Sequence, residues 1–161
     1  TAKGTFVFPK DDPVKLSWAG IGQAEDLVNP ASMMVYMGAI ANGGKAINPY
    51  IISSSNFLKK VTGGDSLGNY LSSGTAGKMK SMMKNDVKVT YGESNFRGLD
   101  IYAKSGTAET GSGTPDAWFV GFIDDADHPY AFVVWVKNGG TGYKVAGPVA
   151  YKTLLALVQN N

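Results

Sequence analysis

Residues 99–104 read Leu-Asp-Ile-Tyr-Ala-Lys, an alternation of side chains that is typical of a half-buried β-strand. Two apolar runs follow at 117–123 and 130–136, and the turn residues 124–129 separate them. A hairpin is the shortest connection between two such runs. The three segments therefore predict a three-stranded antiparallel meander.

Helices are expected before the meander in the sequence, and one more after it. Asn29 can cap a helix that begins at Pro30, and Asn42-Gly43-Gly44 ends it. A second helix is predicted over 75–84, with an apolar face formed by Ala76, Met79, Met82 and Met83. The last helix is amphipathic, and its apolar face consists of Ala146, Ala150, Leu154, Leu157 and Val158.

The remaining segments are predicted to be irregular. Residues 1–12 are interpreted as a loop with one short strand, and residues 53–75 as a loop around short helical pieces. The predicted fold class is therefore α+β, with helices packed on a three-stranded antiparallel meander. A chain of 161 residues is one domain or part of one.

Composition excludes several classes of function. The formal net charge of +2 is too small to predict a nucleic-acid partner, and the absence of cysteine excludes disulfides and thiolate metal sites. The single histidine, His128, is predicted to be a surface residue of the turn Asp127-His128-Pro129, and one histidine cannot build a multi-histidine metal site. No run approaches the roughly 20 apolar residues of a membrane span. The chain starts at Thr1 without a signal peptide, as an excised fragment would.

Chemistry is concentrated in Lys104-Ser105-Gly106-Thr107, at the end of the first meander strand. The lysine supplies charge, the two hydroxyls supply hydrogen bonds, and glycine lets a ligand approach the strand closely. Backbone N–H groups on a free strand edge can hold an oxyanion. The tetrapeptide therefore predicts a site for a carboxylate and an oxyanion.

The surrounding residues resemble the penicillin-binding transpeptidases, in which Lys-(Ser/Thr)-Gly is the third active-site motif. The resemblance covers roughly residues 18 to 158 in the family's order. It is carried by Gly22-Gln23, Asn29-Pro30, the segment 39–49, the motif within 102–110, the strands 116–122 and 130–136, and the helix that contains Gly147-Pro148. The chain is thus identified as the C-terminal portion of a β-lactamase/transpeptidase-like domain, spanning 1–161.

The resemblance also implies roles for the motif residues. Lys104 would help to hold the substrate carboxylate and to tune the proton network. Ser105 and Thr107 would offer hydroxyls to the terminal carboxylate of a D-Ala-D-Ala stem peptide or of a β-lactam, and Gly106 would let that ligand approach. The N–H of Thr107 would be one oxyanion-hole donor. Ala103 stands where the family often has glycine and is expected to narrow the wall of the site slightly.

The family's nucleophile is expected to lie outside this chain. Ser81-Met-Met-Lys84 matches the first motif, Ser-x-x-Lys, and Ser54-Ser55-Asn56 matches the second, Ser-x-Asn, but their order is reversed. Ser81 and Lys84 are also predicted to face away from the apolar stripe of their helix, where a solvated lysine remains protonated. We therefore expect an ordinary helix surface at Ser81 and a polar loop at 54–56.

Trp118 and Trp135 are predicted to pack in the core or on the sheet face rather than to touch substrate. Glu109 and Asp116 could form an acid and base pair, but the glycine-rich segment 110–115 between them predicts no fixed geometry.

The leading hypothesis is therefore a fragment of a peptidoglycan D,D-transpeptidase that acts through an acyl-serine, binds β-lactams and needs no metal or organic cofactor. A serine β-lactamase or D,D-carboxypeptidase relative is an alternative within the superfamily. The alternative of another class is a non-catalytic pseudoenzyme module that binds peptidoglycan or a protein.

The resemblance implies a location on the extracytoplasmic face of the bacterial membrane. The expected partners are the missing N-terminal part of the domain or, in its absence, a second copy in a dimer.

Overall fold

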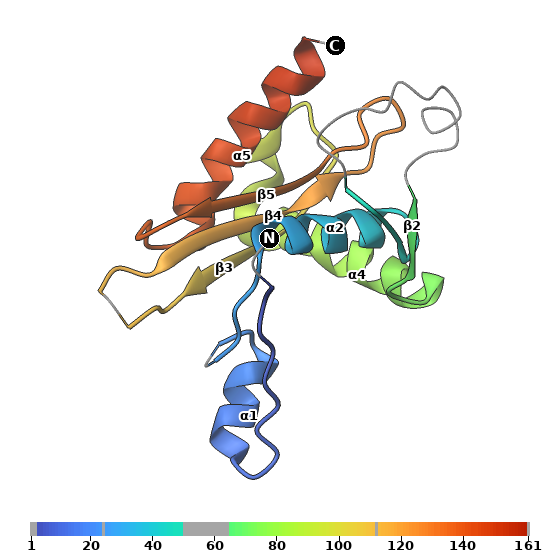
Figure 1. The fold of residues 1–161 in the computed structure, drawn as a ribbon. Helices are drawn as coiled ribbons and strands as arrows, with labels where there is room; N and C mark the ends of the chain where they lie inside the picture. Colours follow the sequence, from blue (N-terminus) through green and yellow to red (C-terminus); the bar gives the residue numbers. More distant parts are fainter. Residues whose placement is uncertain (1–2, 24, 50–64, 112, 161) are drawn as a thin grey trace.

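The computed structural model describes residues 3–23, 25–49, 65–111 and 113–160. Its centre is an antiparallel sheet of β3 (Ile101–Ala108), β4 (Asp116–Ile123) and β5 (Ala131–Val136), in the order β3-β4-β5. The register pairs Lys104 with Val120 and Ala117 with Val136. The predicted meander is therefore confirmed, together with the α+β fold class (Figure 1).

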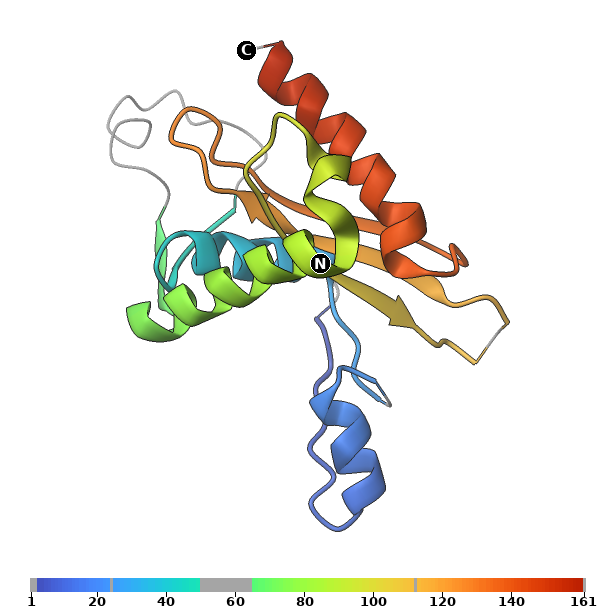
Figure 2. The same ribbon diagram turned by 180° about the vertical axis from the view of Figure 1, so that it is seen from behind.

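Helices cover both faces of this sheet (Figures 1 and 2). The helix α5 (Gly142–Gln159) and the π-helical turn η1 (Val87–Gly92) lie on one face, and the helices α2 (Pro30–Ala41) and α4 (Ser73–Asp86) lie on the other. A short 3-10 turn, η2 (Glu93–Phe96), follows η1. Each face of the sheet thus has its own apolar cluster.

The two clusters follow from the alternation of side chains along the strands. Ile101, Ala103 and Phe119 point toward α5 and are at most 1% exposed. Tyr102 and Phe122 point to the opposite face, where they pack in the cluster that α2 and α4 complete. This alternation also fixes which side chains of the motif face which layer.

The helix starts follow the capping signals. The Asn29 Oδ1 accepts the N–H of Ala31 at 2.8 Å, and α2 begins at Pro30 as predicted. The helix α1 (Pro13–Gly20) was not predicted, although Asp12 caps it in the same way, by accepting the N–H groups of Val14 and Lys15 at 3.0 Å. Asp12-Pro13 thus carried the same signal as Asn29-Pro30. The apolar periodicity of residues 13–20 is weak and did not reveal the helix. The helix α1 projects from the rest of the chain (Figure 1).

The predicted apolar face of the second helix is wrong at one position. Met83 is 6% exposed, but Met82 is 62% exposed. Ala76, Met79 and Met83 stand at the i, i+3, i+7 spacing of one helix face, and Met82 lies well off that face. The helix is also longer than expected and runs directly into η1.

The N-terminal part also contains a small sheet that the sequence did not predict. The strands β1 (Lys45–Ile47) and β2 (Ser66–Asn69) pair antiparallel, so the described part of 53–75 contains a strand rather than short helical pieces before α4. The strand predicted within 1–12 is reduced to one bridge between Thr5 and Leu27. In the described ranges, no helix combines the length and apolar character that crossing a membrane requires.

Candidate active site

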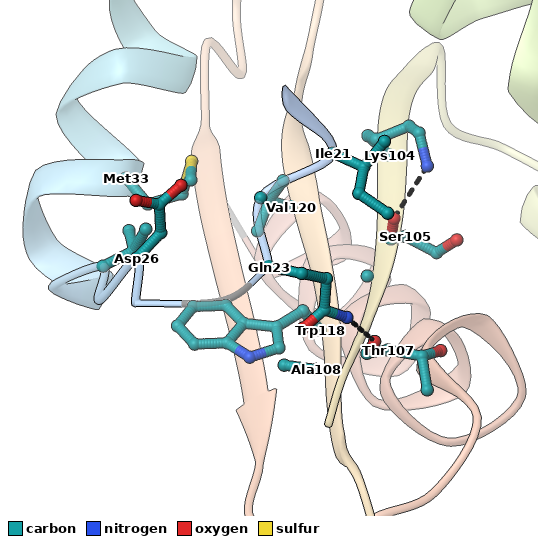
Figure 3. A pocket seen from close by; sticks show the side chains of 13 residues that line it. Ile21, Gln23, Asp26, Met33, Lys104, Ser105, Thr107, Ala108, Trp118 and Val120 are labelled. Atoms are coloured by element: carbon teal, nitrogen blue, oxygen red, sulfur yellow. Dashed lines mark hydrogen bonds between the residues drawn. The ribbon is translucent and has the colours of Figure 1, made fainter. Parts of the chain in front are cut away.

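The four motif residues lie on β3, which is the edge strand of the sheet. They line a pocket on the face that carries α2 (Figure 3). The wall of the pocket also includes side chains from outside β3, among them Gln23, Trp118 and Val120. The structure thus brings Lys104, Ser105, Gly106 and Thr107 together on one open edge.

Of the four outward backbone groups of Ser105 and Thr107 on this edge, three have a hydrogen-bond partner. In an antiparallel edge strand, every second residue directs both its N–H and its C=O away from the neighbouring strand. Ser105 is such a residue, because its N–H donates to the Tyr91 hydroxyl at 2.8 Å and its carbonyl accepts from Lys104 Nζ at 2.8 Å. Thr107 has the same orientation, and its carbonyl accepts from Gln23 Nε2 at 3.1 Å.

The outward N–H of Thr107 remains. Among the residues that the structure describes, it has no hydrogen-bond partner. A backbone N–H on a strand edge beside a lysine and a pocket is suited to a negatively charged oxygen. The geometry therefore supports the role that the resemblance implies for this group.

The side chains of the motif alternate between the two faces of the sheet. Lys104 and Gly106 are on the face of Trp118, as the cross-strand pairs of Lys104 with Val120 and of Gly106 with Trp118 show. Ser105 and Thr107 turn toward α5. The hydroxyl oxygen of Thr107 accepts the N–H of Gly142 at 3.0 Å, at the first residue of α5. Thr107 therefore ties the motif to that helix as well as lining the site.

Gly142 approaches the motif more closely than any side chain would permit. A Cβ atom there would lie 2.1 Å from the carbonyl oxygen of Gly106 and 2.9 Å from that of Trp118. The absence of a side chain lets the start of α5 rest on the motif strand. This contact fixes the strand from the face opposite to the pocket.

Ala103 does not narrow the site, contrary to the expectation from sequence. Its methyl group is 0% exposed and belongs to the apolar cluster under α5. Alternation along the strand directs it away from the pocket. The substitution of alanine for the family's frequent glycine is accommodated in the core.

Two tryptophans lie beside the motif on neighbouring strands. The rings of Trp118 and Trp135 are 5.9 Å apart and tilted, so both pack on the sheet face as predicted. Trp118 also lines the pocket (Figure 3). The prediction of sheet-face packing therefore holds, and Trp118 in addition forms part of the pocket wall.

Asp116 is a structural residue. Its carboxylate accepts the N–H of Asn138 at 2.8 Å and the indole N–H of Trp135 at 2.9 Å. The hydrogen bond from Asn138, and then that from Trp135, lowers the pKa of this carboxyl below its ordinary value. A carboxylate held in its ionised form by two donors is unsuited to proton transfer, in agreement with the expectation that Glu109 and Asp116 form no acid and base pair.

Ser81 does not have the environment of a nucleophile. Its hydroxyl donates to the carbonyl of Gly77 at 3.1 Å on the exposed side of α4. The Nζ of Lys84 lies 2.6 Å from Asp100 and 3.4 Å from Glu93. Burial lowers the pKa of Lys84, but the two carboxylates outweigh this effect and raise it above its ordinary value. Because such a lysine stays protonated, it cannot take a proton from Ser81.

Ser54, Ser55 and Asn56, which match the family's second motif, lie outside the described residues. His128 lies in the predicted turn, where its N–H donates to Asp125 at 2.9 Å. The described ranges hold no cluster of acidic, histidine or cysteine side chains that could bind a metal ion. No role was expected for Gln23 or for Tyr91 from the sequence. Gln23 was only part of the resemblance, and nothing local marks a tyrosine that reaches another element.

These features agree with comparisons to known proteins. The family model of the penicillin binding protein transpeptidase domain matches residues 8–155, and the chain belongs to this family. Among curated proteins it is similar to the peptidoglycan D,D-transpeptidase PbpA of Mycobacterium tuberculosis, with 29% identity over 169 residues and 95% of this chain covered. PbpA of Mycolicibacterium smegmatis is 28% identical over 94% of the chain.

Among solved structures, the imipenem acyl-enzyme complex of M. tuberculosis penicillin-binding protein A superposes with a TM-score of 0.80 and 26% identity. That match covers 98% of this chain and 37% of the other. The chain spans 34% of the length of the M. tuberculosis PbpA that it matches and 33% of the M. smegmatis protein.

Proposed function

We propose that this chain is the C-terminal lobe of a peptidoglycan D,D-transpeptidase domain, spanning residues 1–161, and that it supplies the strand that binds the substrate carboxylate and the oxyanion. The observation that carries the proposal is the unpaired, outward N–H of Thr107 beside Lys104 and the pocket. The relatives named above are D,D-transpeptidases, and one of them was solved as a β-lactam acyl-enzyme.

In this proposal the acylated serine belongs to a part of the domain outside residues 1–161. The stem peptide or β-lactam lies along the edge of β3 and directs its carboxylate to Lys104 and Ser105. When the serine attacks the carbonyl, negative charge develops on the carbonyl oxygen, and the N–H of Thr107 stabilises it. Gly106 keeps the pocket face of β3, next to Trp118, free of a side chain, so that the ligand can approach.

The decisive test separates the N–H of Thr107 from its hydroxyl in the protein encoded by the complete reading frame. Thr107→Val removes the hydroxyl and keeps the N–H, whereas Thr107→Pro removes both. Proline is tolerated on an edge strand where the N–H faces away from the sheet. Loss of one oxyanion donor slows acyl transfer by about 10²–10³-fold, so we expect Thr107→Pro to be acylated by benzylpenicillin that much more slowly than Thr107→Val. Equal rates in two folded variants would refute the role.

A non-catalytic module is the second candidate, because Lys84 is committed to Asp100 and Ser81 to the helix backbone. Such a module would bind peptidoglycan peptides or a protein without forming an acyl-enzyme. The penicillin experiment distinguishes the two: a protein from the complete reading frame that never forms an adduct supports the module.

We further propose that the exposed apolar surface of the N-terminal part packs against the remainder of the domain, or against a second copy when the lobe is isolated. Within the described residues 3–23 and 25–28, seven large apolar side chains are at least 46% exposed: Phe6, Phe8, Val14, Trp18, Ile21, Leu27 and Val28. Such a set marks an association surface. Sedimentation of the isolated chain should show concentration-dependent dimers, and a monomer at high concentration would contradict this. From its membership of the family, we also propose that the whole protein works on the extracytoplasmic face of the membrane.

A further inference from the structure

A buried tyrosine hydroxyl contacts the motif from behind. Tyr91 is 3% exposed, and its ring packs against Phe119 and Tyr143, with centroids 5.4 and 4.9 Å away. It lies in the π-helical turn η1, between α4 and η2. Turns of this kind are frequent at functional sites. Phenylalanine would fill the same space, so the hydroxyl is the feature of Tyr91 that needs an explanation.

Both hydrogen bonds of this hydroxyl go to one residue of the motif. It accepts the N–H of Ser105 at 2.8 Å and donates to the Oγ of Ser105 at 3.1 Å. The backbone of Tyr91 is held as well, because its carbonyl accepts from Asn95 Nδ2 at 2.7 Å and from the Tyr143 hydroxyl at 2.6 Å. Tyr91 is thus a rigid partner of Ser105.

This arrangement determines the direction of the Ser105 proton. Because the Oγ of Ser105 already accepts the tyrosine proton, its own O–H is directed away from Tyr91 and is available to another acceptor. Tyr91 also occupies the outward N–H of Ser105, so that a ligand finds the next outward N–H, that of Thr107, unpaired. The edge of β3 therefore presents one hydroxyl donor and one backbone donor.

We propose that Tyr91 is a positioning residue that holds Ser105 as a hydrogen-bond donor to the carboxylate of the substrate or of a β-lactam. This inference rests on the proposed function. Tyr91 acts through Ser105 and does not itself line the pocket. Its loss is expected to weaken recognition of the carboxylate selectively, rather than to slow acylation of every ligand.

The test compares benzylpenicillin with its methyl ester, which lacks the carboxylate charge, in the protein encoded by the complete reading frame. A hydrogen bond to a charged group corresponds to about a tenfold change in rate or more. For Tyr91→Phe we expect acylation by the acid to slow about tenfold, and acylation by the ester to slow less than about threefold. In a Ser105→Ala background, Tyr91→Phe should cause no further loss with the acid.

Tyr143→Phe is the matched control, since it removes the same atom from a neighbour that bonds to the Tyr91 carbonyl and not to the motif. It should leave the ratio of acid to ester rates unchanged. An equal loss with both ligands in Tyr91→Phe, or no loss with either, would overturn the inference while leaving the proposed function intact. A wild-type protein that forms no adduct, or that does not prefer the acid, would overturn the proposed function and this inference with it.

Discussion

The contact between Gly142 and the motif strand makes a sharp prediction about stability. A methyl group at position 142 would lie 2.1 Å from the Gly106 oxygen, whereas an ordinary contact begins at 3.4 Å. The start of α5 would therefore have to withdraw from β3 by on the order of 1 Å. That movement would also break the hydrogen bond from the Gly142 N–H to the Thr107 hydroxyl.

The expected cost of Gly142→Ala combines these two effects. Overpacking against backbone costs about 1–3 kcal/mol, and the lost hydrogen bond costs about 1 kcal/mol. We therefore expect the free energy of unfolding to fall by about 3 kcal/mol. In a chain of this size, the midpoint of thermal unfolding should fall by about 6–12 °C.

Thermal unfolding followed by circular dichroism measures this effect, and Gly77→Ala is the control. Gly77 lies inside α4, and nothing stands within 4 Å of the position that its Cβ would occupy. Alanine there should stabilise the chain by about 0.5–1 kcal/mol. A Gly142→Ala chain that unfolds at the wild-type temperature would refute the close contact between α5 and the motif.

Three further predictions concern side chains outside the pocket. Asp116→Asn resembles the protonated acid. Because folding lowers the pKa of Asp116, the ionised carboxylate stabilises the fold above about pH 4. The variant should therefore be less stable than the wild type near neutral pH. In an acid titration, this difference in the free energy of unfolding should shrink as the pH falls through the lowered pKa. Met82→Lys should change stability by less than about 0.5 kcal/mol in urea unfolding, whereas Met83→Lys should unfold the chain. Ser81→Ala should leave benzylpenicillin acylation of the protein from the complete reading frame unchanged, and loss of the adduct would contradict the description of α4.

Much of the sheet could be predicted because its signals are local. Alternation over residues 99–104 and two apolar runs define the three strands, and the turn at 124–129 leaves few ways to connect the last two. Asn29 with Pro30 defines the start of α2 for the same reason. The misprediction at Met82 arose because the apolar stripe of this helix in the sequence is wider than the helix face that is buried in the structure.

The tertiary part of the site could not be predicted from local signals. Gln23 and Tyr91 lie in different elements from the motif, and each reaches it through one side-chain atom. Nor does periodicity reveal that position 142 requires glycine. The atoms that Gly142 approaches belong to Gly106 on β3 and to Trp118 on β4. The residues of the motif suggested the chemistry that we propose, whereas the groups that hold the motif in place could be found only from the fold.

We propose that this lobe supplies half of a divided acyl-transfer site. The most direct test of this proposal is intact-mass and peptide mass spectrometry after incubation with benzylpenicillin, on the isolated chain and on the protein from the complete reading frame. We predict no adduct on the isolated chain, and in the larger protein one adduct on a serine outside residues 1–161. A stoichiometric adduct on a serine within this chain, with Ser81 the first to inspect, would contradict the proposal that the acylated serine lies outside residues 1–161.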